Sequence, residues 1–86
     1  MIVSNKPRLK LVIKSRKKEF YNDYASSVTS SNDTGIFDVL PHHANFITLI
    51  KDFIVVDQGL PTRQEFKLER GVMSVKGDTV NAYLGI

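Results

Sequence analysis

Short runs in which apolar and polar residues alternate are the feature that most constrains this fold. Leu9, Leu11 and Ile13 alternate with basic residues except at Val12, and residues 80–86 are apolar at every second position. A period of two places the apolar side chains on one face of a β-strand. Val, Ile and Thr supply 21 of the 86 residues and Ala only 3. This composition favours strands, because β-branched side chains suit a pleated surface.

Turn-forming residues separate these runs at intervals of roughly eight to twelve residues, which is typical of a β-sandwich or a small barrel. Turns are predicted at residues 15–18, 31–35, 57–62 and 76–78. Residues 46–50 are apolar but too few to distinguish a helix from a strand. The pattern therefore predicts eight or nine short strands.

The length of 86 residues predicts one domain spanning residues 1–86, with residues 1–7 as an extended or disordered N-terminal segment. The absence of cysteine excludes a disulfide framework and a thiolate zinc site. No apolar run approaches the roughly 18 residues of a membrane span. We therefore expect a soluble, intracellular protein.

The net charge of +3 hides an asymmetry. Residues 1–18 carry seven basic and no acidic side chains, whereas the remainder carries five basic and nine acidic ones. A basic segment of this kind can attract phosphates, or it can be a solvated strand flank with a lysine-rich turn.

No pattern in the chain predicts catalysis. His42 and His43 are adjacent, so on an extended chain they point to opposite sides and make a poor pair of metal ligands. The glycines lack the close spacing of a phosphate-binding loop. The residues alone predict a β-rich binding or structural module with no catalytic residue, no cofactor and no metal.

A more specific pattern lies in residues 35–48, which read Gly-Ile-Phe-Asp-Val-Leu-Pro-His-His-Ala-Asn-Phe-Ile-Thr. This segment resembles a run in the epsilon subunit of the F-type ATP synthase. Ten of its fourteen positions fit, without a gap: Gly35, Phe37, Val39, Leu40, Pro41, His43, Ala44, Phe46, Ile47 and Thr48. The strands on either side extend the resemblance over about residues 8–86.

Four positions depart from the family pattern. Asp38, His42 and Arg70 stand where the family usually has glycine, and Asn45 where it usually has proline. If those glycines held positive φ angles, an arginine would tolerate that geometry less well than an aspartate. We therefore expect local differences at the turns.

The resemblance implies an all-β fold, a small β-sandwich of about eight to ten short, mostly antiparallel strands. The family's C-terminal helical hairpin has no counterpart in residues 1–86. The implied function is that of a non-catalytic central-stalk subunit of a rotary ATP synthase, coupling the proton-driven rotor ring of the membrane to the gamma subunit. The implied location is peripheral, at the cytoplasmic face of a bacterial inner membrane or in the equivalent organellar compartment, without lipid insertion or nucleic-acid binding.

The resemblance also implies two contact surfaces. The gamma subunit would meet a face with three residues, which are Ser15, His43 and Thr48. The rotor ring would meet a loop with six residues, which are Ser31, Asn32, Asp33, Thr34, Gly35 and Ile36. Ile36 stands at a position that is often acidic in the family.

Two other functions stay open. A small basic-edged β-barrel could bind nucleic acid or another polyanion, since Tyr21 and Tyr24 follow Lys17 and Lys18, and single-strand binders combine aromatic rings with cations. A general adaptor sandwich with another partner is the third interpretation.

Overall fold

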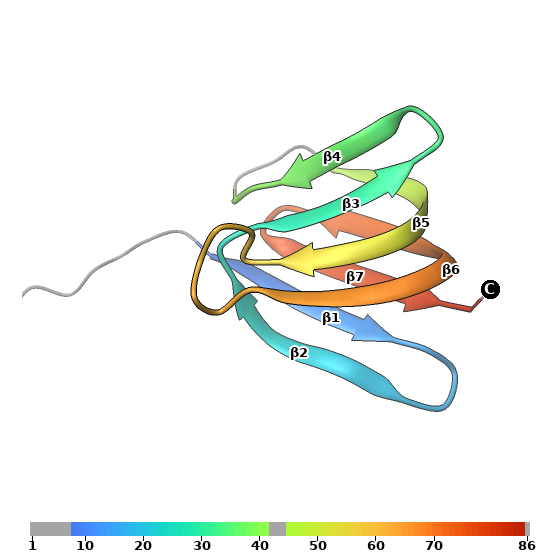
Figure 1. Cartoon of the computed structure of the whole chain (residues 1–86), viewed down its shortest axis with the longest axis horizontal. Helices are drawn as coiled ribbons and strands as arrows, with labels where there is room; N and C mark the ends of the chain where they lie inside the picture. The colour runs from blue at the N-terminus through green and yellow to red at the C-terminus, as the bar shows by residue number, and fades with distance from the viewer. Residues whose placement is uncertain (1–7, 42–44, 86) are drawn as a thin grey trace, which may run out of the picture.

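The computed structural model describes residues 8–41 and 45–85, and contains seven strands and no helix in these ranges (Figure 1). Their bounds are β1 (Leu9–Lys14), β2 (Glu19–Ala25), β3 (Val28–Asn32), β4 (Gly35–Val39), β5 (Phe46–Val56), β6 (Gln64–Lys76) and β7 (Thr79–Leu84). The all-β prediction is confirmed. The N-terminal segment, residues 1–7, lies outside the described residues.

The strands are fewer than the eight or nine expected because two pairs of predicted strands are continuous. Residues 46–50 and 53–56 both belong to β5, and the two halves of β6 join through Glu69 and Arg70. The pairing of β5 with β6 shifts register between Lys51 and Asp52, where Asp52 has a φ of 74°. A bulge bends a strand, but the strand stays paired before and after it. The polar residues at the bulge, which resemble a turn in the sequence, therefore interrupt neither β5 nor β6.

All seven strands are hydrogen-bonded in the order β2-β1-β7-β6-β5-β3-β4. Only β1 and β7 are parallel, and the other neighbours are antiparallel. The predominance of antiparallel pairs agrees with the prediction. The second halves of β5 and β6 curve away from their first halves, so that the sheet folds over itself into two layers (Figure 1).

Two aromatic contacts join strands that are not neighbours in the sheet. The rings of Tyr21 and Phe66 are 6.2 Å apart between their centroids, and those of Phe37 and Phe46 are also 6.2 Å apart. Both pairs meet edge to face, the arrangement that aromatic quadrupoles favour. They pack beside a core of thirteen buried residues: Leu9, Leu11, Ile13, Ala25, Val28, Val39, Ile50, Ile54, Val56, Met73, Val75, Val80 and Ala82.

The turns follow the prediction with one correction. Ser15 N–H donates to the carbonyl of Lys18 at 2.7 Å, which closes the expected lysine-rich turn. The turn predicted for residues 31–35 is shorter, since only Asp33 and Thr34 lie between β3 and β4. The side chain of Asn32 accepts bonds from both the backbone N–H and the hydroxyl of Thr34, and this local bonding lets two residues close the hairpin.

A polar cluster ties the connection between β2 and β3 to the end of β5. Asp57 accepts hydrogen bonds from the backbone N–H of Ser26 and the hydroxyl of Thr62, each at 2.7 Å. Its own N–H donates to the carbonyl of Ser27 at 3.0 Å. Asp57 has a φ of 56°, which aspartate tolerates better than most residues. The cluster fixes the corner where the chain passes between the two layers.

Tyr21 gives this fold a dependence on alkaline pH. Burial raises the pKa of Tyr21 above its ordinary value of 10.0, and the carboxylates of Asp57 and Asp23 raise it further. The folded state therefore favours the neutral phenol. Its contribution to stability is complete below about pH 10 and is lost as the pH rises through the folded-state pKa.

We therefore expect Tyr21→Phe to be less sensitive to alkali than the parent. Urea midpoints measured between about pH 9 and pH 11 should fall less steeply with pH for Tyr21→Phe. Tyr83→Phe, which removes an exposed phenol, is the matched control. Parallel pH profiles for the parent and Tyr21→Phe would contradict the assignment.

Candidate functional site on the outer face

One layer of the sandwich includes β1, β7, residues 70–76 of β6 and residues 46–51 of β5, and its side that faces away from the core forms one continuous surface. Along these four strands, alternate residues face the core and the others point outward. We call this surface the outer face. It consists of Lys10, Val12, Lys14, Ile47, Leu49, Lys51, Arg70, Val72, Ser74, Lys76, Thr79, Asn81 and Tyr83.

The centre of the outer face is apolar. Leu49, Val72 and Tyr83 are directly opposite one another on successive strands, and Ile47 lies two residues from Leu49 on β5. Ile47 is 73% exposed and Leu49 is 68% exposed. Solitary exposed apolar residues are ordinary on a protein surface, but a contiguous patch in register marks an interaction site.

Cations surround this centre. Five of the outer-face residues are basic and none is acidic: Lys10, Lys14, Lys51, Arg70 and Lys76. The basic segment recognised in the sequence supplies two of them, and β5 and β6 supply the other three. The result is a surface with a strongly positive rim and an apolar middle.

Two rim lysines lie over aromatic rings. Lys10 Nζ is 5.2 Å from the centroid of Tyr24, and Lys14 Nζ is 5.3 Å from the centroid of Tyr83. Cation–π attraction restricts a flexible side chain and leaves its charge accessible to solvent. These two cations are therefore held in place before a partner binds.

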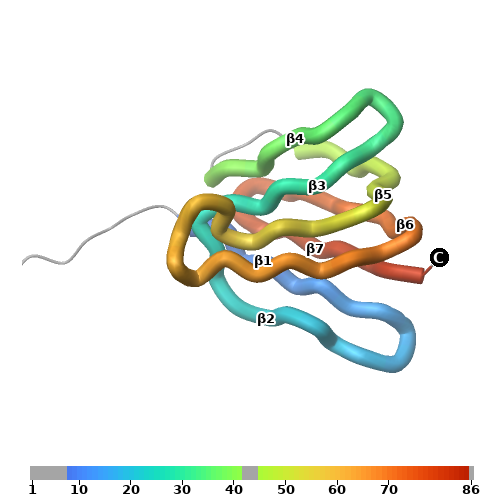
Figure 2. Tube along the Cα trace, viewed as in Figure 1, coloured from blue at the N-terminus to red at the C-terminus, as the bar shows by residue number. Residues whose placement is uncertain are grey.

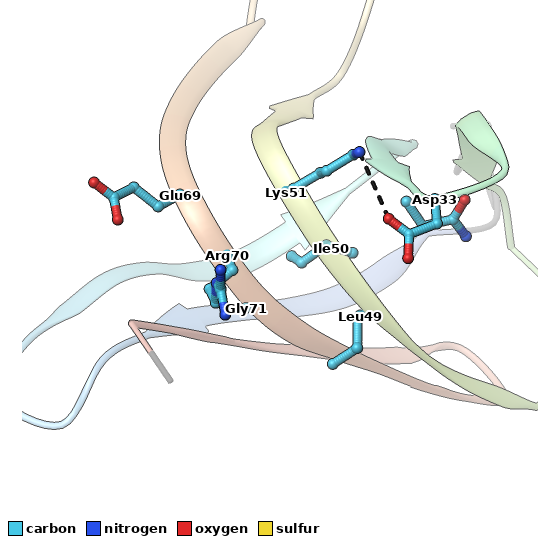
Figure 3. A pocket seen from close by; sticks show the side chains of 8 residues that line it. Asp33, Leu49, Ile50, Lys51, Glu69, Arg70 and Gly71 are labelled. Carbon is cyan, nitrogen blue, oxygen red and sulfur yellow. Dashed lines mark ion pairs between the residues drawn. The ribbon is translucent and has the colours of Figure 1, made fainter.

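A hollow of about 460 Å³ lies beside the outer face, where β5 and β6 bend (Figure 3). Lys51 and Arg70 are directly opposite each other on the two strands and both line this hollow. Lys51 Nζ is 3.6 Å from a carboxylate oxygen of Asp33. Arg70 makes no ion pair with any residue in the part of the chain that the structure describes, and like charges directly opposite each other are unfavourable.

Two of the three residues predicted to meet the gamma subunit, Ser15 and Thr48, do not lie together. Thr48 faces inward, where its hydroxyl accepts a hydrogen bond from the side chain of Asn32 at 3.2 Å. Ser15 lies at the end of β1, three strands away from β5. His43 lies outside the described residues. Sequence reasoning missed Ile47 and Leu49, the exposed neighbours of Thr48 in this candidate site, because residues 46–50 are mostly apolar and show no clear alternation.

The residues predicted to meet the rotor ring gather at the β3–β4 hairpin. Asp33 and Thr34 form the exposed turn, with Gly35 beside them, and Ile36 is 72% exposed. Ser31 is only 7% exposed and sits between Ile36 and Lys51 in the sheet. The hairpin lies at the end of the sandwich opposite to the β5–β6 loop (Figure 2).

The departures from the family glycines do not strain the backbone where the structure describes them. The non-glycine residues with positive φ in the described ranges are Asp52 and Asp57, so Asp38 and Arg70 adopt ordinary geometry. Asp38 accepts a hydrogen bond of 2.6 Å from the hydroxyl of Thr29 on the neighbouring strand. His42 lies outside the described residues.

Within residues 8–41 and 45–85, no group of three or more acidic or histidine side chains could hold a metal ion. These same ranges contain no helix that could cross a bilayer. The aromatic pair proposed for polyanion binding is divided between two surfaces. Tyr21 packs against Phe66 and donates its hydroxyl hydrogen to the carbonyl of Tyr24, whereas Tyr24 lies under Lys10.

Comparison with known proteins identifies the fold family. The sequence profile for "ATP synthase, Delta/Epsilon chain, beta-sandwich domain" matches residues 8–82. This chain belongs to that family. No curated protein is significantly similar to the chain in sequence.

Two solved structures share this fold. A chain of the Euglena gracilis mitochondrial ATP synthase (OSCP/F1/c-ring) superimposes with a TM-score of 0.80 at 14% identity, over 94% of this chain and 53% of that one. A chain of the Tetrahymena thermophila mitochondrial ATP synthase central stalk and c-ring gives 0.74 at 11% identity, over 96% and 67%. The present chain thus spans about half to two thirds of the length of these relatives.

Proposed function

We propose that this chain is a non-catalytic central-stalk subunit of a rotary F-type ATP synthase, coupling the proton-driven rotor ring to the gamma subunit. The observation that carries the proposal is the match to the delta/epsilon family over residues 8–82. The two structural relatives support it, because both are chains of mitochondrial ATP synthases. The proposed location is peripheral to the membrane, at the cytoplasmic face of a bacterial inner membrane or in the equivalent organellar compartment.

The architecture suits a part that transmits torque. β5 and β6 have 11 and 13 residues and are paired along their length, so they connect the two layers without a hinge. A close-packed core between layers resists deformation. A force applied at the β3–β4 hairpin therefore reaches β6 and β7 through the hydrogen-bonded ladders that join β3, β5, β6 and β7.

The gamma subunit is assigned to the outer face, with its apolar centre at Ile47 and Leu49. This places the contact beside Thr48, whose own side chain faces inward. The rotor ring is assigned to the β3–β4 hairpin, with Asp33, Thr34 and Ile36 as the accessible contacts. Both assignments involve protein partners, and neither needs nucleic acid or lipid insertion.

Cysteine cross-linking in membranes of the source organism tests the proposal, because the parent chain has no cysteine. A tagged chain purified at roughly 0.3 M salt, which screens loose charge attraction, should bring the gamma and ring subunits with it. Thr34→Cys should form a cross-link to the ring subunit. Gln58→Cys, in the β5–β6 loop at the opposite end (Figure 2), is the matched control and should not.

Two results would contradict parts of this proposal. If neither gamma nor ring subunits accompany the folded chain, the stalk function is wrong. If both accompany it but Gln58→Cys rather than Thr34→Cys cross-links to the ring, the stalk function stands and the hairpin assignment is wrong.

A further inference from the structure

We propose that the outer face binds a surface of the gamma subunit that is apolar at its centre and acidic at its rim, with carboxylates in two groups about 20 Å apart. This inference rests on the proposed function, since it describes the chemistry of the partner that the function assigns to this face. It goes beyond the function because it predicts the charge and spacing of groups on the partner.

The two groups follow from the positions of the five rim cations. Lys51 and Arg70 lie at the end of the face where β5 and β6 bend, and Lys10 and Lys76 lie at the other end. Lys14 lies on β1, level with the apolar centre. Arg70 and Lys76 are six residues apart on β6, in a stretch where the pairing with β5 and β7 does not shift register. At about 3.4 Å per residue in a strand, this spacing is about 20 Å.

Charge complementarity identifies the rim of the partner. Two carboxylates lie beside these five cations, with Asp33 at 3.6 Å from Lys51 and Glu19 directly opposite Lys14 on β2. Lys51 and Arg70 still repel each other from directly opposite positions. A neutral or basic partner would bury this repulsion, whereas an acidic rim would relieve it. Lys10 and Lys14 already lie over Tyr24 and Tyr83, so they lose little freedom when they pair.

The centre of the face favours protein over nucleic acid. Its most exposed side chains are the aliphatic Ile47 and Leu49, which have no flat ring on which a base could stack. Tyr83, which lies on the same face two strands from Leu49, carries Lys14 over its ring. Single-strand binders depend on accessible aromatic platforms, while protein interfaces combine a desolvated apolar centre with a polar rim.

The experiment measures the association rate constant with the gamma subunit of the same organism by stopped flow, at about 0.02 M and 0.3 M salt. One double variant, Lys51→Glu with Arg70→Glu, reverses the charge at the end of the rim where β5 and β6 bend. A second double variant, Lys10→Glu with Lys76→Glu, reverses the charge at the other end. Arg16→Glu with Lys17→Glu, in the exposed β1–β2 turn, is the control with the same change of net charge. Electrostatic steering changes such rates by about 10- to 1000-fold.

We expect each outer-face double variant to slow association about 10- to 100-fold at low salt and to lose most of the salt dependence. The control should change the rate by less than about threefold. Thermal unfolding checks each variant first, and glutamine replaces glutamate where a reversal lowers the melting temperature.

Three results would overturn the inference. If the control slows association as much as the outer-face variants do, the rate depends only on the net charge of the chain. The inference about the rim is then wrong, whereas the proposed binding of gamma stands. No complex between gamma and the parent chain would overturn the proposed function as well. Binding of a labelled single-stranded oligonucleotide to the parent, weakened by the same outer-face substitutions, would assign the face to a polyanion.

Discussion

Replacing Leu49 with glutamate should weaken binding of the gamma subunit by roughly a hundredfold or more, about 3 kcal/mol, and leave the stability of the free sandwich nearly unchanged. Leu49 is 68% exposed, so the core does not depend on it. In the free protein the new carboxylate lies near Lys51 and Arg70. In the complex it would be buried against an apolar surface and would compete with the partner's own carboxylates.

The measurement is a titration with the gamma subunit at roughly 0.3 M salt, together with the urea midpoint of each variant. Leu49→Ala should lose less, about tenfold, because it removes contact area without adding a charge. Leu60→Glu is the matched control, since Leu60 is also an exposed leucine but lies in the β5–β6 loop. A folded Leu49→Glu variant that binds gamma as tightly as the parent would show that gamma uses another face.

The strands that were predicted correctly are those whose signal is local. β1 and β7 alternate strictly enough that their buried and outward positions follow from the sequence, and the structure buries Leu9, Leu11 and Ile13 completely. The extents of β5 and β6 could not be predicted in this way. Whether Asp52 and Glu69 end a strand or form a bulge depends on pairing with a strand distant in the sequence, and no short window contains that information.

The candidate site was less predictable, because it forms only when the strands are assembled. Residues 46–50 are mostly apolar, so their sequence does not show that Ile47 and Leu49 are exposed while Ile50 is buried. The pairing with β6 decides that. The basic segment at the N-terminus was visible, but Lys51, Arg70 and Lys76 join it from other strands. The resemblance named Thr48, one residue from the exposed pair, yet the assignment of its face required the sheet.

A single added methyl group at Gly71 should be among the most destabilising small changes in this chain. A Cβ at Gly71 would lie 2.5 Å from the carbonyl oxygen of Tyr83 and 3.2 Å from a methyl carbon of Leu84. The first contact is with backbone, so no rotation of a side chain can relieve it. The β6–β7 ladder must shift instead, which explains why glycine is required here while the adjacent position accepts Arg70.

We expect Gly71→Ala to lower the free energy of unfolding by roughly 2–4 kcal/mol, which corresponds to a fall in melting temperature of about 10–25 °C for a domain of this size. The sign of the stability change distinguishes a steric clash from the ordinary effect of replacing glycine in a strand. Gly71 does not have a positive φ, and alanine in a strand is otherwise favoured over glycine by roughly 0.5–1 kcal/mol. Calorimetry measures the melting temperature of Gly71→Ala, with Ser74→Ala on the same strand as the control. A lower melting temperature for Gly71→Ala means that the clash of the added Cβ exceeds the intrinsic gain from alanine.

The same substitution should also weaken gamma binding, because a shift of β7 moves Tyr83 within the outer face. The loss should be present even at temperatures where Gly71→Ala is fully folded by circular dichroism. An unchanged or raised melting temperature would mean that the β6–β7 spacing is wider than the structure shows. A lowered melting temperature with unchanged gamma affinity would place the gamma contact away from Tyr83, toward Ile47 and Leu49 on β5.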